Sequence, residues 1–314
     1  MRVLLTGSSG WLGRFLAPRL RAEGHEVIGL DIAAGAHTDI IGSIADPQVI
    51  ARAFDRGIDA VIHSAALHKP DIARYPAQAF IDVNITGTLN LLEAAANAGH
   101  DRFVFTSTTS LMISQSVRDE TSDAAVWLDE NCAPLAPRNI YGVTKLSAEG
   151  LCRLYAKDRG LACIVLRTAR FFPENDDLLT VPSGENLKAN ELLNRRLTVE
   201  DAADAHIVAL ERAPEIGFGT FILSAPTPFQ PSDVHELKTD AAATIARYFP
   251  DAPSLYAQRG WTLPTSIGRI YSSAQAENRL GFRCSASFAD VLNALREGSP
   301  MPFTHDPSYQ SPAL

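Results

Sequence analysis

Cysteine and long apolar runs are both scarce in this sequence of 314 residues. The four cysteines form no CxxC pair, which indicates reduced thiols of a cytoplasmic protein rather than a disulfide framework. The apolar stretches are strand-length, well short of the ~20 residues that a membrane span requires. Met1 leads directly into an apolar strand without the features of a signal peptide. We therefore expect a cytoplasmic protein with no membrane partner.

Excess basic charge and metal-ligand spacing are also lacking. The 28 lysines and arginines are outnumbered by 36 aspartates and glutamates, which gives a formal net charge of -8. That balance argues against a nucleic acid as the main partner. The eight histidines show no spacing such as HExxH, so we expect no metal site. With 46% hydrophobic and 20% charged residues, the composition is that of an ordinary globular protein.

Apolar runs of strand length alternate with helical patterns through the first half of the chain. This alternation predicts an α/β fold with a doubly wound parallel sheet and right-handed crossovers. After about residue 170 the alternation loosens, and proline and glycine become frequent. The expected strands are 3–6, 25–31, 60–64, 103–107 and 161–168, and the expected helices are 11–24, 78–98, 139–157, 199–212 and 288–296.

A glycine-rich segment, TGSSGWLG (6–13), joins the first expected strand to the first expected helix. Gly7 permits a tight turn, Gly10 allows the backbone to approach a pyrophosphate, and Gly13 allows the helix to pack closely on the sheet. The amino terminus of the helix then offers free N–H groups and the positive end of its dipole to the phosphates. This strand–turn–helix context favours a dinucleotide site over a plain glycine-rich turn.

An acidic residue ends the second expected strand. Asp31 lies 18 residues after Gly13, where a carboxylate can accept both hydroxyls of an adenosine ribose and repel a 2′-phosphate. No lysine or arginine stands between Asp31 and Asp46 to neutralise such a phosphate. We therefore predict NAD rather than NADP as the cofactor; the alternative is an aspartate that only caps a turn.

A tyrosine and a lysine stand four residues apart in the helix expected over 139–157. Tyr141 and Lys145 therefore project from one helix face. A nearby ammonium favours the phenolate and lowers the tyrosine pKa from its usual value of about 10, which suits acid–base catalysis. The pair is common by chance, but a hydroxyl-rich segment (106–110) ends the preceding strand. A parallel sheet directs that strand end to the same crevice as the glycine turn.

Together these motifs resemble the extended short-chain dehydrogenase/reductase family, in its NAD-dependent epimerase/dehydratase group. The resemblance covers most of the chain and runs in order through TGSSGWLG, VIHSAA (61–66), NITGTLNLLEAA (84–95), FVFTSTTS (103–110), YGVTK (141–145), LRTARFFP (166–173), LTVEDAADAH (197–206) and RLG (279–281). It implies an NAD-binding Rossmann domain over residues 1–170 and a smaller substrate-binding region over 171–297 with returns to the sheet domain. Residues 298–314 are left as an irregular tail.

The resemblance also implies roles for single residues. Tyr141 becomes the general acid/base, and Lys145 holds the nicotinamide ribose and lowers the tyrosine pKa. Thr108 falls where the family places the hydroxyl that hydrogen-bonds the reacting oxygen, and Ser107 is the second candidate for that contact. His68 falls where some epimerases carry a lysine near the cofactor, although a loop histidine is often only solvated. The residues expected along the cofactor are Gly7, Ser9, Gly10, Trp11, Leu12, Gly13, Asp31, Ser43, Ile44, Ser64, Ala65, Ala66, His68, Asn84, Thr106, Tyr141 and Lys145.

The substrate region departs from the family pattern. Nucleotide-sugar enzymes of the family usually carry a long excursion before the segment that matches LTVEDAADAH, whereas the connection from Arg170 to Asn194 is short here. Asn194 stands roughly where they often place a phosphate-binding arginine, although Arg195 and Arg196 follow at once. We therefore expect a substrate smaller than a nucleotide sugar, such as a free sugar, a sugar acid or a similar polyol.

Arg170 stands where nucleotide-sugar enzymes usually have an asparagine. Two interpretations stay open: a contact with an anionic substrate, or an ion pair with a nearby carboxylate, since charge networks are often structural. The carboxylates within reach of Arg170 in the sequence are Glu174, Asp176 and Asp177.

Arg269 and Tyr271 lie where relatives often place substrate-side residues.

Three functions remain in competition. The first is an NAD-dependent dehydrogenase or reductase that acts on a secondary alcohol or ketone of a small sugar-like substrate. The second is a nucleotide-sugar 4-epimerase of the UDP-glucose type, which oxidises its substrate transiently with the same residues. The third is a redox sensor that binds NAD without turnover, although the retention of Tyr141 and Lys145 counts against it. Family members are often dimers through the helices near Asn84 and Tyr141, so a homodimer is an expectation.

Overall fold

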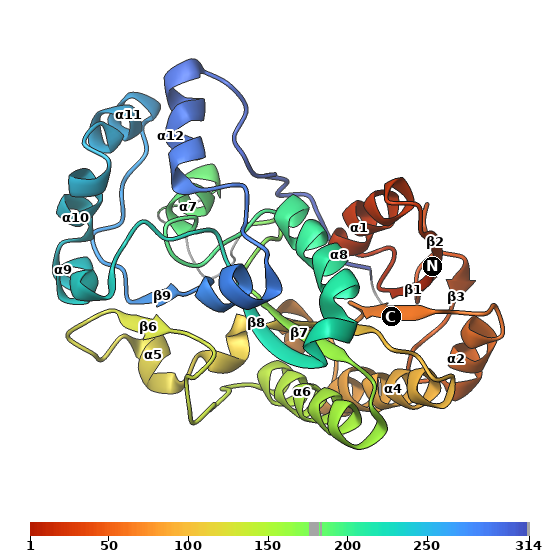
Figure 1. The fold of residues 1–314 in the computed structure, drawn as a ribbon. Helices are drawn as coiled ribbons and strands as arrows, with labels where there is room; N and C mark the ends of the chain where they lie inside the picture. Colours follow the sequence, from red (N-terminus) through yellow and green to blue (C-terminus); the bar gives the residue numbers. More distant parts are fainter. Residues whose placement is uncertain (176–181, 183, 313–314) are drawn as a thin grey trace.

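Seven parallel strands form one sheet in the computed structural model, which describes residues 1–175, 182 and 184–312. The strand order is β3-β2-β1-β4-β5-β7-β8, so the order reverses on either side of β1 (Figure 1). The predicted doubly wound α/β sheet is confirmed. Its strands are β1 (Arg2–Thr6), β2 (Glu26–Asp31), β3 (Ile40–Ile41), β4 (Ala60–His63), β5 (Phe103–Thr108), β7 (Cys163–Thr168) and β8 (Phe218–Leu223).

Helices cover both faces of this sheet because its strands are apolar on both sides. In β1, Val3 and Leu5 pack into one core cluster and Leu4 into another, as the alternation of side chains along a strand requires. Figure 1 shows α1 and α8 on one face and α2, α4 and α6 on the other. These helices are α1 (Trp11–Ala22), α2 (Pro47–Phe54), α4 (Gly87–Asn97), α6 (Ile140–Arg159) and α8 (Val199–Ile216).

The helix expected over 78–98 is divided by a wider turn. A short α3 (Ala77–Phe80) leads into a π-helical stretch (Ile81–Thr86), and α4 follows without a break in direction. Such π turns occur frequently at functional sites. Here the stretch carries Asn84, whose side chain is buried beneath the loop that follows β4.

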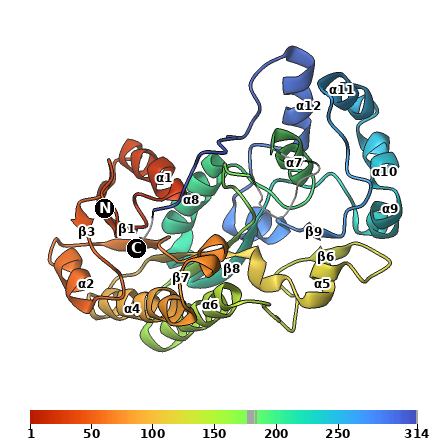
Figure 2. The same cartoon turned by 180° about the vertical axis from the view of Figure 1, so that it is seen from behind.

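A second lobe follows β7 and has its own apolar core. It lies at one end of the molecule in both views, away from α1 and α2 (Figures 1 and 2). A pair of parallel strands borders it beneath: β6 (Val126–Leu128) pairs with β9 (Arg269–Tyr271), and α5 (Gln115–Asp119) lies beside them. The helices of this lobe are α7 (Gly184–Glu191), α9 (Val234–Thr239), α10 (Ala241–Tyr248), α11 (Ala252–Arg259) and α12 (Phe288–Glu297).

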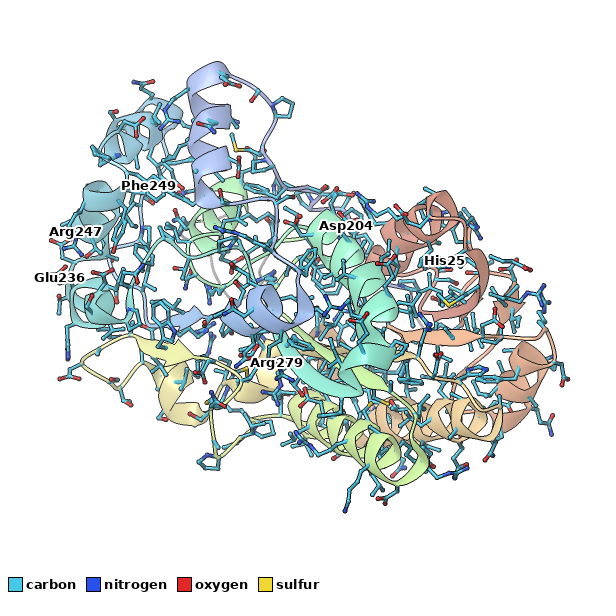
Figure 3. The ribbon with its side chains drawn as sticks, in the orientation of Figure 1. His25, Asp204, Glu236, Arg247, Phe249 and Arg279 are labelled. Carbon is cyan, nitrogen blue, oxygen red and sulfur yellow. The ribbon has the colours of Figure 1, made fainter. Side chains whose placement is uncertain are left out.

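Ion pairs connect neighbouring elements at the surface of both lobes. Arg247 lies beside Glu236 at the edge of the second lobe in Figure 3, and it also contacts Asp233 at 2.7 Å. Asp204 of α8 receives a hydrogen bond from Arg19 of α1 at 3.0 Å, which joins two helices that are far apart in the sequence. β8 is a strand of the large sheet and α8 packs against α1 and β7, although both elements follow residue 170; the division of the chain near residue 170 stays a proposal.

Within the described residues, no helix is both long enough and apolar enough to cross a bilayer. Residues 298–312, the described part of the segment after α12, contain no helix or strand. This segment runs along the molecule, back past α8 and α1 toward β1 (Figure 2).

Candidate active-site crevice

A crevice of about 960 Å³ opens at the carboxyl ends of the sheet strands. It is lined by the glycine turn after β1, by the loops after β2, β4, β5 and β7, and by residues of β9. The order of the strands reverses at β1 and β4, and ligands of open α/β sheets bind at such a switch point.

The glycine turn is shaped by close contacts that leave no room for side chains. Gly7 has φ +76°, and a Cβ placed on it would lie 2.8 Å from the backbone nitrogen of Ala65. A Cβ on Gly13 would lie 2.2 Å from the carbonyl oxygen of Gly7. Gly10 precedes α1 and supplies no side-chain cap, so the N–H groups of the first helical turn stay available. This arrangement fits a pyrophosphate at the helix terminus.

Asp31 is held at the mouth of the glycine turn. One carboxylate oxygen accepts the backbone N–H of Ser9 at 2.9 Å, and the other accepts the N–H of Ala33 at 3.0 Å. Each oxygen keeps a second lone pair, and the side chain lines the crevice. The carboxylate is therefore fixed in a position that fits the two hydroxyls of a ribose.

Tyr141 lies in the first turn of α6, where Asn139 caps the helix by accepting the N–H of Gly142 at 2.9 Å. Burial raises the pKa of Tyr141 to about 12, while a hydrogen bond with Thr108 lowers it. The direction is opposite to our prediction of a lowered pKa. The reason is that the phenolate loses its hydration in the crevice, and this cost exceeds the effect of the Thr108 hydroxyl.

Lys145 lies one turn further along α6, under β5. Its ammonium donates to the backbone carbonyl of Thr106 at 2.5 Å and lies 4.0 Å from the centroid of the Phe105 ring. Burial lowers the pKa of Lys145 to about 7. Burial thus shifts the pKa of both Tyr141 and Lys145 in the direction of the neutral form, and positive charge brought into the crevice would favour the phenolate.

The three hydroxyls that end β5 have three different partners. Thr106 bonds Nε2 of His206 at 2.7 Å, and the other ring nitrogen of His206 donates to the carbonyl of Ala202, which makes the imidazole the acceptor from Thr106. The Ser107 hydroxyl donates to Glu149 at 2.6 Å on the opposite side of the strand. Thr108 alone of the three is paired with Tyr141. This geometry favours Thr108 over Ser107 as the hydroxyl that faces substrate.

Glu149 is a buried residue that our sequence reasoning missed. Besides Ser107, its carboxylate pairs with Arg167 of β7 at 2.7 Å, and both side chains are almost fully buried. Tyr141, Lys145 and Glu149 stand at successive four-residue intervals on one face of α6. Extending the four-residue spacing by one step would have found it.

Three of the residues expected along the cofactor stand behind the crevice wall. Gly13 packs against the turn, and the Ser9 hydroxyl donates to the carbonyl of Ala33 at 2.9 Å. Asn84 exchanges two hydrogen bonds of 2.9 Å with the backbone of Leu67, which fixes the loop after β4. The other expected residues line the crevice: Gly7, Gly10, Trp11, Leu12, Asp31, Ser43, Ile44, Ser64, Ala65, Ala66, His68, Thr106, Tyr141 and Lys145, with Ser107, Thr108 and Arg170 among the substrate residues.

Positive side chains gather at the end of the crevice formed by α5 and β9. Arg118, Arg138 and Arg269 come from three separate segments, and none has a carboxylate within 4.0 Å in the part of the chain that the structure describes. The guanidinium pKa of Arg138 is lowered by burial and by the charges of the other two. Three cations gathered in this way attract anions.

Arg170 and Arg195 also line the crevice, together with the carboxylates of Glu174 and Glu191. Arg195 is 3.3 Å from Glu191, and the Arg170 charge acts on both carboxylates. Asp176 and Asp177, the other candidate partners of Arg170, lie outside the described residues. Asn194 donates to the carbonyl of Arg269 and lies beneath the crevice wall.

The charge of the crevice contrasts with that of the chain. Among the residues that the structure describes, eight lysines and arginines line it against four carboxylates, whereas the chain carries a formal charge of -8. The lining charges are Lys69, Arg74, Arg118, Arg138, Lys145, Arg170, Arg195 and Arg269, with Asp31, Asp71, Glu174 and Glu191.

Among residues 1–175, 182 and 184–312, no group of three or more histidine, cysteine or acidic side chains could hold a metal ion.

A family model described as the NAD dependent epimerase/dehydratase family matches residues 3–219. The chain is 27% identical over 270 residues to the uronate dehydrogenase of Pseudomonas syringae pv. tomato, across 82% of this chain and 92% of that protein. It is 33% identical over 171 residues to the L-arabinose 1-dehydrogenase (NAD(P)(+)) of Haloferax volcanii, across 53% of this chain and 65% of that enzyme. The second alignment therefore spans less than two thirds of its relative.

Solved structures share the fold over nearly the whole chain. The UDP-glucose 4-epimerase of Thermus thermophilus, in complex with NAD, has a TM-score of 0.63 at 20% identity and covers 94% of this chain and 99% of its own. A mutated uronate dehydrogenase has the same TM-score and identity and covers 99% of this chain and 90% of its own. At this identity the likeness concerns the fold alone.

Proposed function

Because the chain belongs to the NAD-dependent epimerase/dehydratase family, we propose that it is an NAD-dependent oxidoreductase acting on a secondary alcohol or ketone of a small, anionic, sugar-like substrate. The observation that carries the proposal is the position of the paired Tyr141 and Thr108 hydroxyls, which share one crevice with the glycine turn and Asp31. Dinucleotide and substrate would thus meet beside a proton-transfer group.

The glycine turn would hold the pyrophosphate and Asp31 the adenosine ribose, and the cofactor would supply the hydride acceptor or donor. Asp31 favours NAD over NADP, because its carboxylate would repel a 2′-phosphate. In the oxidation, the phenolate form of Tyr141 would take the proton of the substrate hydroxyl while hydride leaves the carbon that bears this hydroxyl. Thr108 would hold the reacting oxygen, and Lys145 would position the ribose and add positive charge when protonated.

The arginines at the far end of the crevice support an anionic substrate. A carboxylate or phosphate group there would meet Arg118, Arg138 and Arg269, none of which is paired with a carboxylate among the described residues. The names of two relatives, a uronate dehydrogenase and an L-arabinose dehydrogenase, agree with a small sugar or sugar acid. The short connection between Arg170 and Asn194 supports the same size limit.

A 4-epimerase of nucleotide sugars is the second candidate. The cationic end of the crevice could also meet a diphosphate, and solved UDP-glucose 4-epimerases share the fold. The two functions use the same hydroxyls, so the catalytic residues do not separate them. The products do, because an epimerase returns its hydride and accumulates no NADH.

The test is the absorbance of NADH after the purified protein is mixed with excess NAD and a panel of free sugars, sugar acids, neutral polyols and UDP-sugars. We expect NADH to accumulate with a sugar acid. Inverted UDP-sugar without net NADH would establish the epimerase and refute the small substrate. Tyr141→Phe should reduce turnover by roughly 10²–10⁴-fold while NADH binding persists. If no panel member turns over and Tyr141→Phe changes nothing measurable, the sensor is favoured.

We also propose a homodimer through α6 and the π-helical stretch. Three large apolar side chains are exposed on these elements: Ile81 at 37%, Val143 at 44% and Leu154 at 49%. Exposed apolar side chains grouped on neighbouring helices are typical of an interface. Light scattering on the wild type and on Leu154→Glu should show a dimer that the substitution weakens.

A further inference from the structure

Residues 305–312, which follow α12, return from the second lobe to the cofactor crevice. They leave the lobe near α7, where Nζ of Lys188 lies 3.0 Å from Nδ1 of His305. The N–H of Asp306 then donates to the carbonyl of Pro173 at 2.9 Å. Figure 1 shows the chain after α12, in dark blue, running past α8 toward α1. Its residues Pro307, Tyr309, Gln310, Ser311 and Pro312 line the crevice.

Tyr309 is seated on the glycine-turn side of the crevice. Its ring meets Trp11, the first residue of α1, edge-on with centroids 5.0 Å apart. The guanidinium of Arg14 lies 5.8 Å from the centre of the same ring. The first turn of α1 is the expected pyrophosphate site, so Tyr309 stands beside it.

Ser311 reaches the opposite side of the crevice. Its hydroxyl lies 3.1 Å from Nε2 of His68, in the loop after β4. The His68 ring stacks on Phe172 with centroids 5.1 Å apart, so this contact point is itself fixed. Two residues apart in sequence, Tyr309 and Ser311 therefore bridge the two sides between which the dinucleotide would lie.

The crevice of about 960 Å³ is lined both by the glycine turn and by Pro307, Tyr309, Gln310, Ser311 and Pro312, so this segment forms part of its wall. Pro307 and Pro312 flank the bridging residues and restrict the backbone there. Few and individually weak contacts hold the segment in place, which makes it able to open.

We propose that residues 305–312 form a strap over the cofactor site, and that the contacts of Tyr309 with Trp11 and of Ser311 with His68 must break before the dinucleotide can enter or leave. The strap adds residues to the cofactor site and sets the rate of exchange. The inference rests on NAD binding and is independent of which substrate is turned over.

The test measures NADH binding and release by stopped-flow fluorescence in the full chain. Tyr309→Ala removes the ring that rests on Trp11 and should raise the dissociation rate constant of NADH by about tenfold, since aromatic and cation–π contacts of this kind are individually modest. Tyr309→Phe keeps the ring and should stay near the wild type. Tyr248→Ala removes an equivalent ring from the second lobe, away from the crevice, and should leave NADH release unchanged.

Hydrogen exchange gives a second readout that does not depend on turnover. Saturating NAD should slow exchange of the amides of 305–312 in the wild type and should protect them less in Tyr309→Ala. Unchanged NADH release in Tyr309→Ala would overturn the proposal. Tighter NADH binding by that variant would overturn it too, because the segment would then compete with the cofactor. If Tyr309→Ala does not fold, Ser311→Ala provides the same test. We expect it to release NADH faster than the wild type, and an unchanged rate of NADH release would refute the proposal.

Discussion

We expect the burial of Lys145 to lower the free energy of unfolding of the protein at neutral pH. Its pKa falls from 10.5 to about 7 on burial, so between these values the unfolded chain binds the proton more tightly than the folded chain does. The penalty is complete below pH 7 and is relieved as the pH rises toward 10.5, which means that stability increases over this window. Lys145→Met removes the titration and keeps an apolar stem of similar length.

The magnitude follows from the two pKa values. The linkage penalty is about 5 kcal/mol at pH 6 and about 2 kcal/mol at pH 9. Loss of the hydrogen bond to Thr106 and of the contact with Phe105 costs the variant about 1–2 kcal/mol, but that cost does not depend on pH. The wild type should therefore gain about 2–3 kcal/mol over Lys145→Met between pH 6 and pH 9.

Urea unfolding of both proteins at pH 6, 7, 8 and 9, without added dinucleotide, measures this difference. Lys157→Met is the matched control, because Lys157 is an exposed lysine on the same helix. The difference between wild type and control should be flat across the series. A flat difference between wild type and Lys145→Met as well would show that Lys145 keeps an ordinary pKa in the folded state, and the burial argument would fail.

Three further substitutions test the rest of the site. Arg269→Met should raise KM for a sugar acid by roughly tenfold or more and leave kcat for a neutral polyol unchanged. Steady-state kinetics measures both values, and equal effects on the two substrates would refute the anion site. Asp31→Asn should weaken NAD binding about tenfold and narrow the preference over NADP, measured by NADH and NADPH titration, and an unchanged preference would remove Asp31 from the ribose contact. Glu149→Leu should lower the free energy of unfolding by about 3–5 kcal/mol in urea, because it leaves the Arg167 charge buried and unpaired; a neutral result would mean that Arg167 finds water.

The sequence predicted those strands whose apolar character is continuous. Every residue of β7 is buried, and its run of Cys163–Thr168 is readable as a strand at sight. β8 was missed: it contains Gly219, it follows a stretch in which the alternation has loosened, and it becomes a strand by pairing with β7. Pairing partners distant in sequence leave no local pattern.

In the site, local turn chemistry was predictable and side-chain direction was less so. The glycine turn and Asp31 follow from spacing, and their placement needs only one βαβ unit. Period-two alternation would have separated Ser107 from Thr106 and Thr108, because neighbours in a strand face opposite sides. The strap was beyond prediction, since nothing between Gly298 and Ser311 indicates that Tyr309 meets Trp11.

The pKa of Tyr141 shows a different limit. The Tyr–Lys spacing predicts proximity, and proximity of an ammonium lowers a phenol pKa only while the ammonium keeps its proton. In this crevice burial acts on both groups, so the pKa of Lys145 itself lies near neutral pH. The charge state of the pair therefore depends on what else the crevice holds, and a sequence spacing carries no information about that.

One face of α6 joins catalysis to stability. Tyr141 and Lys145 point toward the crevice, while Glu149, one turn beyond, receives the Ser107 hydroxyl of β5 and pairs with Arg167 of β7. Breaking a buried ion pair is costly, so the pair restrains the placement of the helix, even though Nη1 of Arg167 has no hydrogen-bond partner among the described residues. The same bonds that restrain α6 on the two strands also restrain the distance between Tyr141 on the helix and Thr108 at the end of β5. The charged residues that do not touch substrate would thus define the geometry of those that do.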